Sequence, residues 1–406
     1  MKDLASAKRF LQDIFQIPSD YIIPLQITIQ AKEILLQLLS KINKIQCTKP
    51  NFTFVTKGID KLKLSSFYDS IPKNIQDEIE VKSYNQEMYD FILPSGRQMY
   101  LYIMSEIKKD SSILYNHIYV WLQFIDSLTT KIKIGKECCQ SLNIFIIMNE
   151  NEKKLPKERF VPLHSNNINS GFTFTCKENN DIFIYRKEEV LKVFIHETFH
   201  SFHLDFSNMD QTRMNEKIKE TFQGIHGNQD LRIYEAYTET WAEMINILLL
   251  NKTETSFHKI NESIFYEKLW SIFQCGKILH HYNLILTDLL TKNIDSISFG
   301  NEKDTFPFSY FVLKAICLEN INEFLLFCHK ENSHFINFTH TIKNTISFCS
   351  LVTTIKKKDK TSNHINNITF MNGLDRVHVW FYQDIKKKIN QNDVFFLKTL
   401  RMSMYG

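Results

Sequence analysis

The sequence predicts an α+β protein in which a small mixed sheet is embedded in a mostly helical chain. β-type runs gather in the middle of the chain, at 142–148, 172–176 and 182–185, where β-branched and aromatic residues favour strands. Before and after them, apolar residues recur at helical spacing over long stretches. The chain has 406 residues, enough for two or three packed subdomains.

The N-terminal elements follow from local patterns. Residues 1–48 are predicted to form two helical pieces, interrupted at Pro18 and Pro24. Residues 49–84 show a mixed pattern. A hairpin is predicted at 86–104, and a helix follows the polar cap at 110–112.

The later elements are mainly helical. The pattern predicts helices at 188–203 and 232–250, separated by a polar loop to about 229, and further helices at 257–291, 309–329, 335–355 and 377–391. The charged segment 356–364 is predicted to be a solvated loop. These patterns divide the chain into a helical and mixed region (1–84), a central domain (85–252) and a helical C-terminal domain (253–406).

Composition argues against several classes of protein. The 49 basic and 45 acidic residues leave a net charge of +4, and arginine is scarce, so no nucleic-acid partner is expected. The N-terminus lacks an apolar signal-peptide core, and no apolar run approaches the length of a membrane span, so no membrane association is expected. The eight cysteines include no CxxC pair, which predicts buried free thiols and a cytoplasmic, reducing compartment.

The strongest motif is HExxH in the predicted helix 188–203. Residues four apart project from the same face of a helix, so His196 and His200 can bind one metal ion. Neutral imidazoles at this spacing suit zinc, and Glu197 lies where it can take a proton from a zinc-bound water. The competing interpretation is a buried helix whose two histidines have structural partners.

A catalytic zinc site needs a third protein ligand. The predicted helix 232–250 offers three carboxylates on one face, Glu235, Glu239 and Glu243. Three acids on one face repel each other unless a positive charge lies opposite, which a zinc ion would supply. Spacing alone leaves open which of the three binds the metal, and an exposed acidic stripe is the alternative.

Together, His196-Glu197-Thr-Phe-His200 and Glu239-Thr-Trp-Ala242-Glu243 resemble the gluzincin metallopeptidases, whose signature is HExxH followed by ExxA[E/D]. The resemblance implies a zincin-like central domain with His196, His200 and Glu239 as metal ligands. It further implies that Glu243 orients a ligand histidine, with Glu235 as the alternative third ligand. The segment 169–176 resembles the zincin edge strand that pairs with extended peptide substrates. The Lys/Ile/Asn-rich composition and the phrase Leu204-Asp205-Phe206-Ser207 are loosely similar to uncharacterised zincin-like proteins of large DNA viruses, which implies a viral protein of the host cytoplasm or virion.

Three further positions near the motif stay open. His203 is expected to lie near the cleft rather than bind the metal, because three ligands on one straight helix converge poorly. Asp205 fits either a hydrogen bond to a ligand imidazole or a surface cap. Gluzincins stabilise the oxyanion with a Tyr or His donor, for which the sequence offers Tyr234, Tyr237, His226 and Arg232.

The sequence therefore predicts a zinc metalloendopeptidase acting on protein or peptide substrates. Zinc would polarise the scissile carbonyl, and Glu197 would act as general base and pass the proton to the leaving amine. Two alternatives remain: a non-catalytic zinc-binding or scaffold protein, and a zymogen whose residues 1–84 cover the cleft. Pattern alone indicates neither the cleavage specificity nor the oligomeric state.

Overall fold

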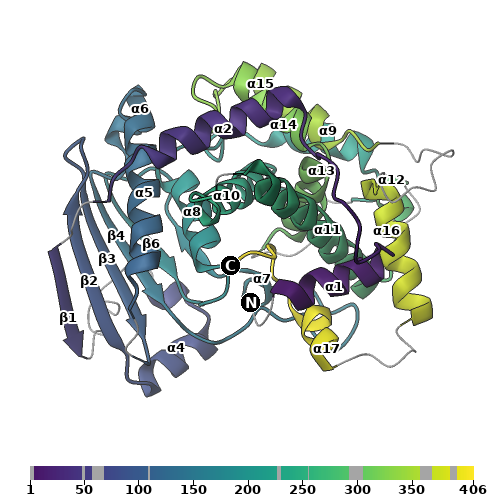
Figure 1. Ribbon diagram of the computed structural model, residues 1–406, viewed down its shortest axis with the longest axis horizontal. Coiled ribbons are helices and arrows are strands. Elements are labelled where there is room, and N and C mark those ends of the chain that lie inside the picture. Colours follow the sequence, from purple (N-terminus) through teal and green to yellow (C-terminus); the bar gives the residue numbers. More distant parts are fainter. Residues whose placement is uncertain are drawn as a thin grey trace.

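The computed structural model describes residues 4–47, 51–56, 68–107, 110–225, 230–254, 256–291, 305–356, 368–384 and 391–406. Within these ranges the protein is α+β, as the sequence predicts. A mixed sheet forms one side of the molecule and helices form the other (Figure 1). No helix in the described ranges is both long and apolar enough to cross a membrane.

The sheet of the described chain has six strands in the spatial order β1-β2-β3-β4-β6-β5. The neighbours β3, β4 and β6 run parallel, whereas β1, β2 and β5 join the sheet by antiparallel pairing. The strands are β1 (Asn51–Thr56), β2 (Asn85–Ile92), β3 (Gln98–Ser105), β4 (Ser141–Ile147), β5 (Gly171–Thr173) and β6 (Asn179–Ile184). The short strand β5 therefore forms one edge of the sheet.

The helices follow the order of the chain. Up to β5 they are α1 (Leu4–Ile14), α2 (Ile29–Asn43), the 3-10 helix η1 (Tyr68–Ser70), α4 (Lys73–Val81), α5 (Ser112–Thr129), α6 (Lys133–Glu137) and α7 (Ser165–Ile168). After β6 they are α8 (Val190–Ser201), α9 (Thr212–Thr221), α10 (Tyr234–Leu250), α11 (Phe257–His281), α12 (Leu286–Leu290), the π-helix η2 (Phe308–Leu313), α13 (Lys314–Glu319), α14 (Ile321–Glu331), α15 (Ile342–Val352), α16 (Phe370–Val379), the π-helix η4 (Trp380–Asp384) and α17 (Gln391–Lys398).

Most of the predicted elements around the sheet are confirmed. The predicted hairpin is β2 and β3, the run 142–148 is β4, and the two helices that carry the motifs are α8 and α10. Strand β5 is shorter than the predicted run 172–176. Cys176 has a φ of 40°, in the left-handed region that strands exclude.

Other predicted boundaries are wrong, because periodicity does not show where a helix starts or stops. The predicted loop before 229 contains α9, whose buried Met214 and Ile218 lie one turn apart. The predicted helix 257–291 is divided into α11 and α12. The predicted helix 335–355 begins only at Ile342. Thr369 caps α16 well before the predicted start at 377. Residues 357–364 of the predicted polar loop and residues 385–390 lie outside the described part of the chain.

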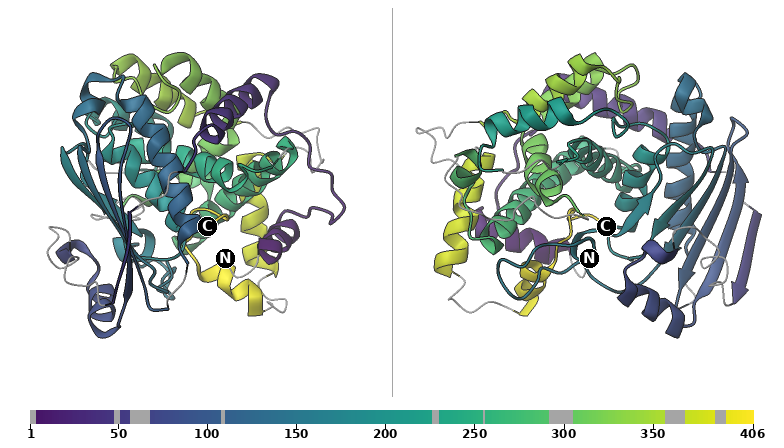
Figure 2. Two further views of the ribbon diagram at one scale, coloured as in Figure 1. Left: turned by 60° about the vertical axis from the view of Figure 1, so that its left-hand side comes forward. Right: turned by 180° about the vertical axis from the view of Figure 1, so that it is seen from behind.

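The two faces of the sheet are covered differently. Along β4, side chains alternate between the faces: Ile144 and Ile146 belong to the main core with α5 and α8, whereas Phe145 and Ile147 pack with Ile75 of α4. Helix α4 therefore covers the outer face, and α5 and α8 cover the face toward the helices (Figure 2). Helices α10 and α11 run through the interior, so α10 is buried on nearly all sides (Figure 1).

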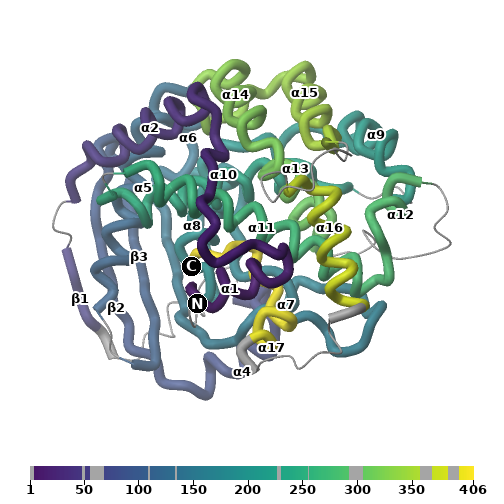
Figure 3. The backbone as a smooth tube through the Cα atoms, turned by 45° about the vertical axis from the view of Figure 1, so that its right-hand side comes forward, coloured from purple at the N-terminus to yellow at the C-terminus, as the bar shows by residue number. Residues whose placement is uncertain are grey.

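Contacts join the three predicted regions. Strand β1 pairs along its whole length with β2 across the border at residue 84. Helix α2 contacts both α5 and α14, and its course along the outside of the molecule is visible in Figure 3. The division into three domains stays a prediction.

Candidate metal centre

Helix α8 carries HExxH in the core beside the edge of the sheet. It contacts β5, β6, α5 and α10. Its flanks Glu189 and His203 both have left-handed backbones, with φ of 58° and 59°. On the side facing α5, the indole of Trp121 donates a hydrogen bond of 2.8 Å to the hydroxyl of Thr198. These contacts fix the orientation of the helix, and with it the direction of its two histidines.

Three ligand atoms converge between α8 and α10. The Nε2 atoms of His196 and His200 lie 3.1 Å apart. Oε2 of Glu235 lies 3.2 Å from the first and 3.4 Å from the second. A tetrahedral zinc ion with bonds of about 2.0–2.2 Å has ligand atoms about 3.3–3.6 Å apart. The three separations lie within about 0.2 Å of this range, so the triangle is close to the size that one such ion requires.

The chemistry of this triangle also fits a cation. Oε2 of Glu235 is buried and makes no hydrogen bond to the described residues. Burial alone would raise the pKa of Glu235, but His200 and His196 outweigh it and hold this pKa at about 2. Burial alone would lower the pKa of His196, but Glu239 outweighs it and raises this pKa to about 9. The site therefore favours positive charge at its centre, which a divalent ion supplies.

Each histidine also has a carboxylate at its other ring nitrogen. Nδ1 of His200 hydrogen-bonds Asp205, whose carboxylate also accepts from Thr238 (3.2 Å) and from the backbone of Ser207 (2.9 Å). Nδ1 of His196 lies 2.9 Å from Oε1 of Glu239. The hydrogen bond to Asp205 holds the proton of His200 on Nδ1 and leaves its Nε2 lone pair for a metal. The contact of Glu239 with Nδ1 of His196 has the distance of an ion pair but not the geometry of a hydrogen bond.

The three acids of α10 lie at different distances from the two imidazoles. Glu235, one turn before the predicted Glu239, lies with the two Nε2 atoms. Glu239 instead contacts Nδ1 of His196 and accepts hydrogen bonds of 2.8 and 3.0 Å from Lys192. Glu243 pairs with Lys314 (2.7 Å) and not with a histidine of the motif. It lies two turns beyond Glu235, about 12 Å along the helix.

The triangle faces a cleft. An outer cavity of about 170 Å³ is lined by residues that include His196, Glu197, His200 and Glu235. An inner cavity of about 50 Å³ shares His196 and Glu197 and extends to Lys192. No described residue from 1–84 lines either cavity. The described part of that region therefore lends no support to a cleft-covering prosegment.

Glu197 lies at the junction of these cavities. Its buried carboxylate borders both of them, and burial raises its pKa. Gly171 of β5 leaves room for it, since a Cβ on Gly171 would lie 3.3 Å from Oε1 of Glu197. Glu197 is thus next to the triangle but not part of it, as a general base requires.

Tyr310 is a hydroxyl donor that sequence reasoning missed. It lines both cavities, and its ring lies 6.3 Å from that of His196. Burial and the nearby carboxylates of Glu235 and Glu239 raise the pKa of Tyr310 well above its usual value, so the hydroxyl stays protonated. Tyr310 belongs to the π-helix η2, far along the chain from HExxH, and no local motif marks it.

The predicted donors have different positions. Tyr234 and Arg232 line the outer cavity. The hydroxyl of Tyr237 instead donates to the carbonyl of Ile336 in the core (2.8 Å), and His226 lies outside the described residues. His203 is not part of the triangle. Its ring contacts Asn208 (3.1 Å) and His340.

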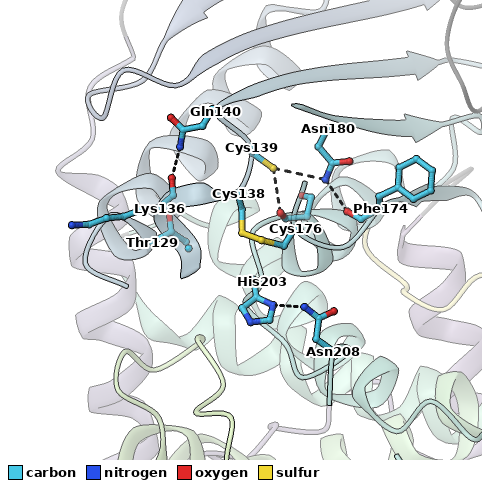
Figure 4. Close-up of a disulfide and its surroundings, with 12 residues drawn as sticks. Thr129, Lys136, Cys138, Cys139, Gln140, Phe174, Cys176, Asn180, His203 and Asn208 are labelled. Atoms are coloured by element: carbon cyan, nitrogen blue, oxygen red, sulfur yellow. Dashed lines mark hydrogen bonds between the residues drawn. A yellow bond between two sulfur atoms is a disulfide. The ribbon is translucent and has the colours of Figure 1, made fainter. Parts of the chain in front are cut away.

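Cys138 and Cys176 form a disulfide, which corrects the prediction that all eight cysteines are thiols (Figure 4). It joins the chain before β4 to the loop between β5 and β6, where the backbone N–H of Cys176 donates to the carbonyl of His200 (3.3 Å). Because disulfides are rare in reducing compartments, the cysteines no longer indicate a reducing compartment. Buried thiols are confirmed at Cys139, Cys275, Cys317, Cys328 and Cys349.

No protein-family model matches the chain, and searches of curated proteins and of solved structures also find no match.

Proposed function

We propose that the protein is a zinc-dependent metallopeptidase of the gluzincin type, with a zincin-like arrangement of sheet edge, HExxH helix and second ligand helix. The observation that carries this proposal is the triangle of His196 Nε2, His200 Nε2 and Glu235 Oε2, with Glu197 beside it. Two imidazoles and one carboxylate, with a cleft on the open side, form the ligand set of a catalytic zinc ion.

Zinc bound by these three residues supplies a Lewis acid that polarises a substrate carbonyl and lowers the pKa of bound water from 15.7 to about 7. Glu197 takes the proton from the attacking water and passes it to the leaving amine. Asp205 orients the ring of His200 through its hydrogen bond to Nδ1, and the carboxylate of Glu239 lies 2.9 Å from Nδ1 of His196. The Tyr310 hydroxyl donates a hydrogen bond to the oxyanion that forms from the carbonyl.

The edge strand supports a peptide as the substrate. Gly171 and Phe172 of β5 line the outer cavity, and β5 pairs with β6 along one side only within the described sheet. An extended peptide can add to this edge by main-chain hydrogen bonds. Its scissile bond would then pass between β5 and the triangle.

Glu197→Gln tests the proposal. The variant should keep its zinc, because Glu197 is not a ligand, and should lose about 10²–10⁴-fold in the rate of peptide cleavage. The matched control is Glu216→Gln on the exposed side of α9, which should cleave at the wild-type rate. Zinc content by mass spectrometry and cleavage of a quenched peptide library give the two measurements.

Wild-type cleavage by the Glu197→Gln variant would remove Glu197 from its role. Zinc binding by the wild-type protein without cleavage of any library member would favour a non-catalytic zinc-binding protein instead.

A further inference from the structure

Arg232 is a cation in the candidate active-site cleft that the proposed mechanism does not use. It lines the outer cavity together with His196, His200 and Glu235. Among the described residues that line this cavity it is the only Lys or Arg. Its backbone carbonyl accepts the N–H of Glu235 (2.9 Å), so Arg232 sits at the start of the ligand helix, at a fixed position relative to the triangle.

The side chain of Arg232 packs against an aromatic ring. Its guanidinium carbon lies 4.1 Å from the ring centroid of Phe306, which also lines the cavity. Its backbone has a φ of 45°, and its backbone N–H donates to Oδ1 of Asp230 (3.0 Å), so these two features fix the main chain at Arg232. Arg232 is exposed, and within the described ranges its guanidinium makes no ion pair with an acid.

The chemistry of the group indicates what it binds. Stacking on an aromatic ring engages the face of a guanidinium and leaves its N–H donors, which lie in its plane, free to bind a ligand. Those donors match the two oxygens of a carboxylate in a bidentate pair. The remaining charged lining residues, Glu197 and Glu235, are occupied by the reaction and the metal. A guanidinium without an acid partner beside them therefore suits an anion brought by the substrate.

We propose that Arg232 binds a carboxylate of the peptide substrate, so that the enzyme selects peptides that present a carboxylate at this subsite. This inference rests on the proposed peptidase function, since it assigns the substrate class of that same site. The carboxylate has two sources, an acidic side chain near the scissile bond or the C-terminal carboxylate of the peptide. The same guanidinium disfavours peptides with Lys or Arg at that subsite.

The test measures binding, so that it does not depend on turnover. The zinc-loaded Glu197→Gln protein is titrated with fluorescent octapeptide pools, random except for a central Glu, Gln or Lys and ending in a carboxylate or an amide. Arg232→Gln is then added to this background. The matched control is Arg213→Gln, an exposed arginine on α9 that lines neither cavity.

The preferred pool should bind about tenfold more tightly than its uncharged counterpart, which corresponds to the lower end of the free energy that a hydrogen bond to a charged group contributes. A side-chain source predicts tighter binding of Glu pools than Gln pools, and a terminal source predicts tighter binding of carboxylate pools than amides. Either preference should disappear with Arg232→Gln, persist with Arg213→Gln, and change to a preference for Lys pools with Arg232→Glu. Equal binding of all pools, or a preference that survives Arg232→Gln, would overturn the inference. Cleavage by the wild-type protein is scored separately, so failure of the peptidase proposal is recognised by itself.

Discussion

Glu235→Gln and Glu239→Gln distinguish the metal ligand from the acid behind it. Each substitution keeps the size of the side chain and removes its charge. In the structure, Glu235 approaches both Nε2 atoms, whereas the one imidazole nitrogen that Glu239 approaches among the described residues is Nδ1 of His196. We therefore expect the larger loss of zinc affinity from Glu235→Gln, although the sequence pattern favours Glu239.

The magnitudes follow from these two positions. Loss of a carboxylate that orients a ligand histidine reduces metal affinity about 10–100-fold. Loss of a coordinating carboxylate should cost more than the upper end of that range, over about 2.8 kcal/mol at 1.4 kcal/mol per tenfold change. Glu239→Gln carries an additional structural cost, because Lys192 is buried and pairs with Glu239.

The assay is competition for zinc against a fluorescent chelator at neutral pH. Thermal unfolding of each metal-free variant serves as the control, because it separates loss of a ligand from loss of the fold. A larger loss of affinity for Glu239→Gln, in a variant as stable as Glu235→Gln, would show that the assignment of the third ligand is wrong.

Three other predictions follow from the cleft and its surroundings. Tyr310→Phe removes the proposed hydrogen bond to the oxyanion and should lower kcat by about 10²–10³-fold. The zinc affinity of this variant should be unchanged. An unchanged kcat would exclude Tyr310 as the oxyanion donor. Gly171→Ala places a Cβ 2.7 Å from the carbonyl oxygen of Phe183 and 2.9 Å from Cγ1 of Val193. Because this overpacks the site, urea unfolding should show a free energy of unfolding lower by about 1–3 kcal/mol. A variant as stable as the wild-type protein would contradict this expectation. The Cys138–Cys176 disulfide closes a loop with a sequence separation of 38 and should contribute about 4 kcal/mol by the loop-entropy relation. Reductant should therefore lower the denaturant midpoint of the wild-type protein and leave that of the Cys138→Ser/Cys176→Ser double variant unchanged.

Local sequence patterns account for the HExxH pair. His196 and His200 lie one turn apart on a single helix, so their convergence needs no knowledge of tertiary structure. The helix itself was predictable because apolar residues flank the motif, and its limits in the structure differ from those predicted by only two residues at each end.

The third ligand depends on how two helices pack. Glu235 and Glu239 both lie on the face of α10 toward α8. Which one reaches the Nε2 atoms is decided by the axial offset of the two helices, and Lys192 of α8 neutralises the other. Neither the offset nor that ion pair can be read from spacing.

Contacts between distant segments were likewise invisible in the sequence. Tyr310 reaches the cleft only because η2 packs against α10. Cys138 meets Cys176 because they precede β4 and β6, which are parallel neighbours in the sheet. In both cases the sequence separation is long and the residue types are common, so no local signal marks them.

The metal content of the purified full-length protein tests the central claim most directly. After dialysis against metal-free buffer, native mass spectrometry should show about one zinc ion per chain, as expected for a single three-ligand site. Substitution of both motif histidines, His196→Ala/His200→Ala, should abolish this binding. A wild-type protein that is folded yet binds no metal when zinc is supplied would contradict the account.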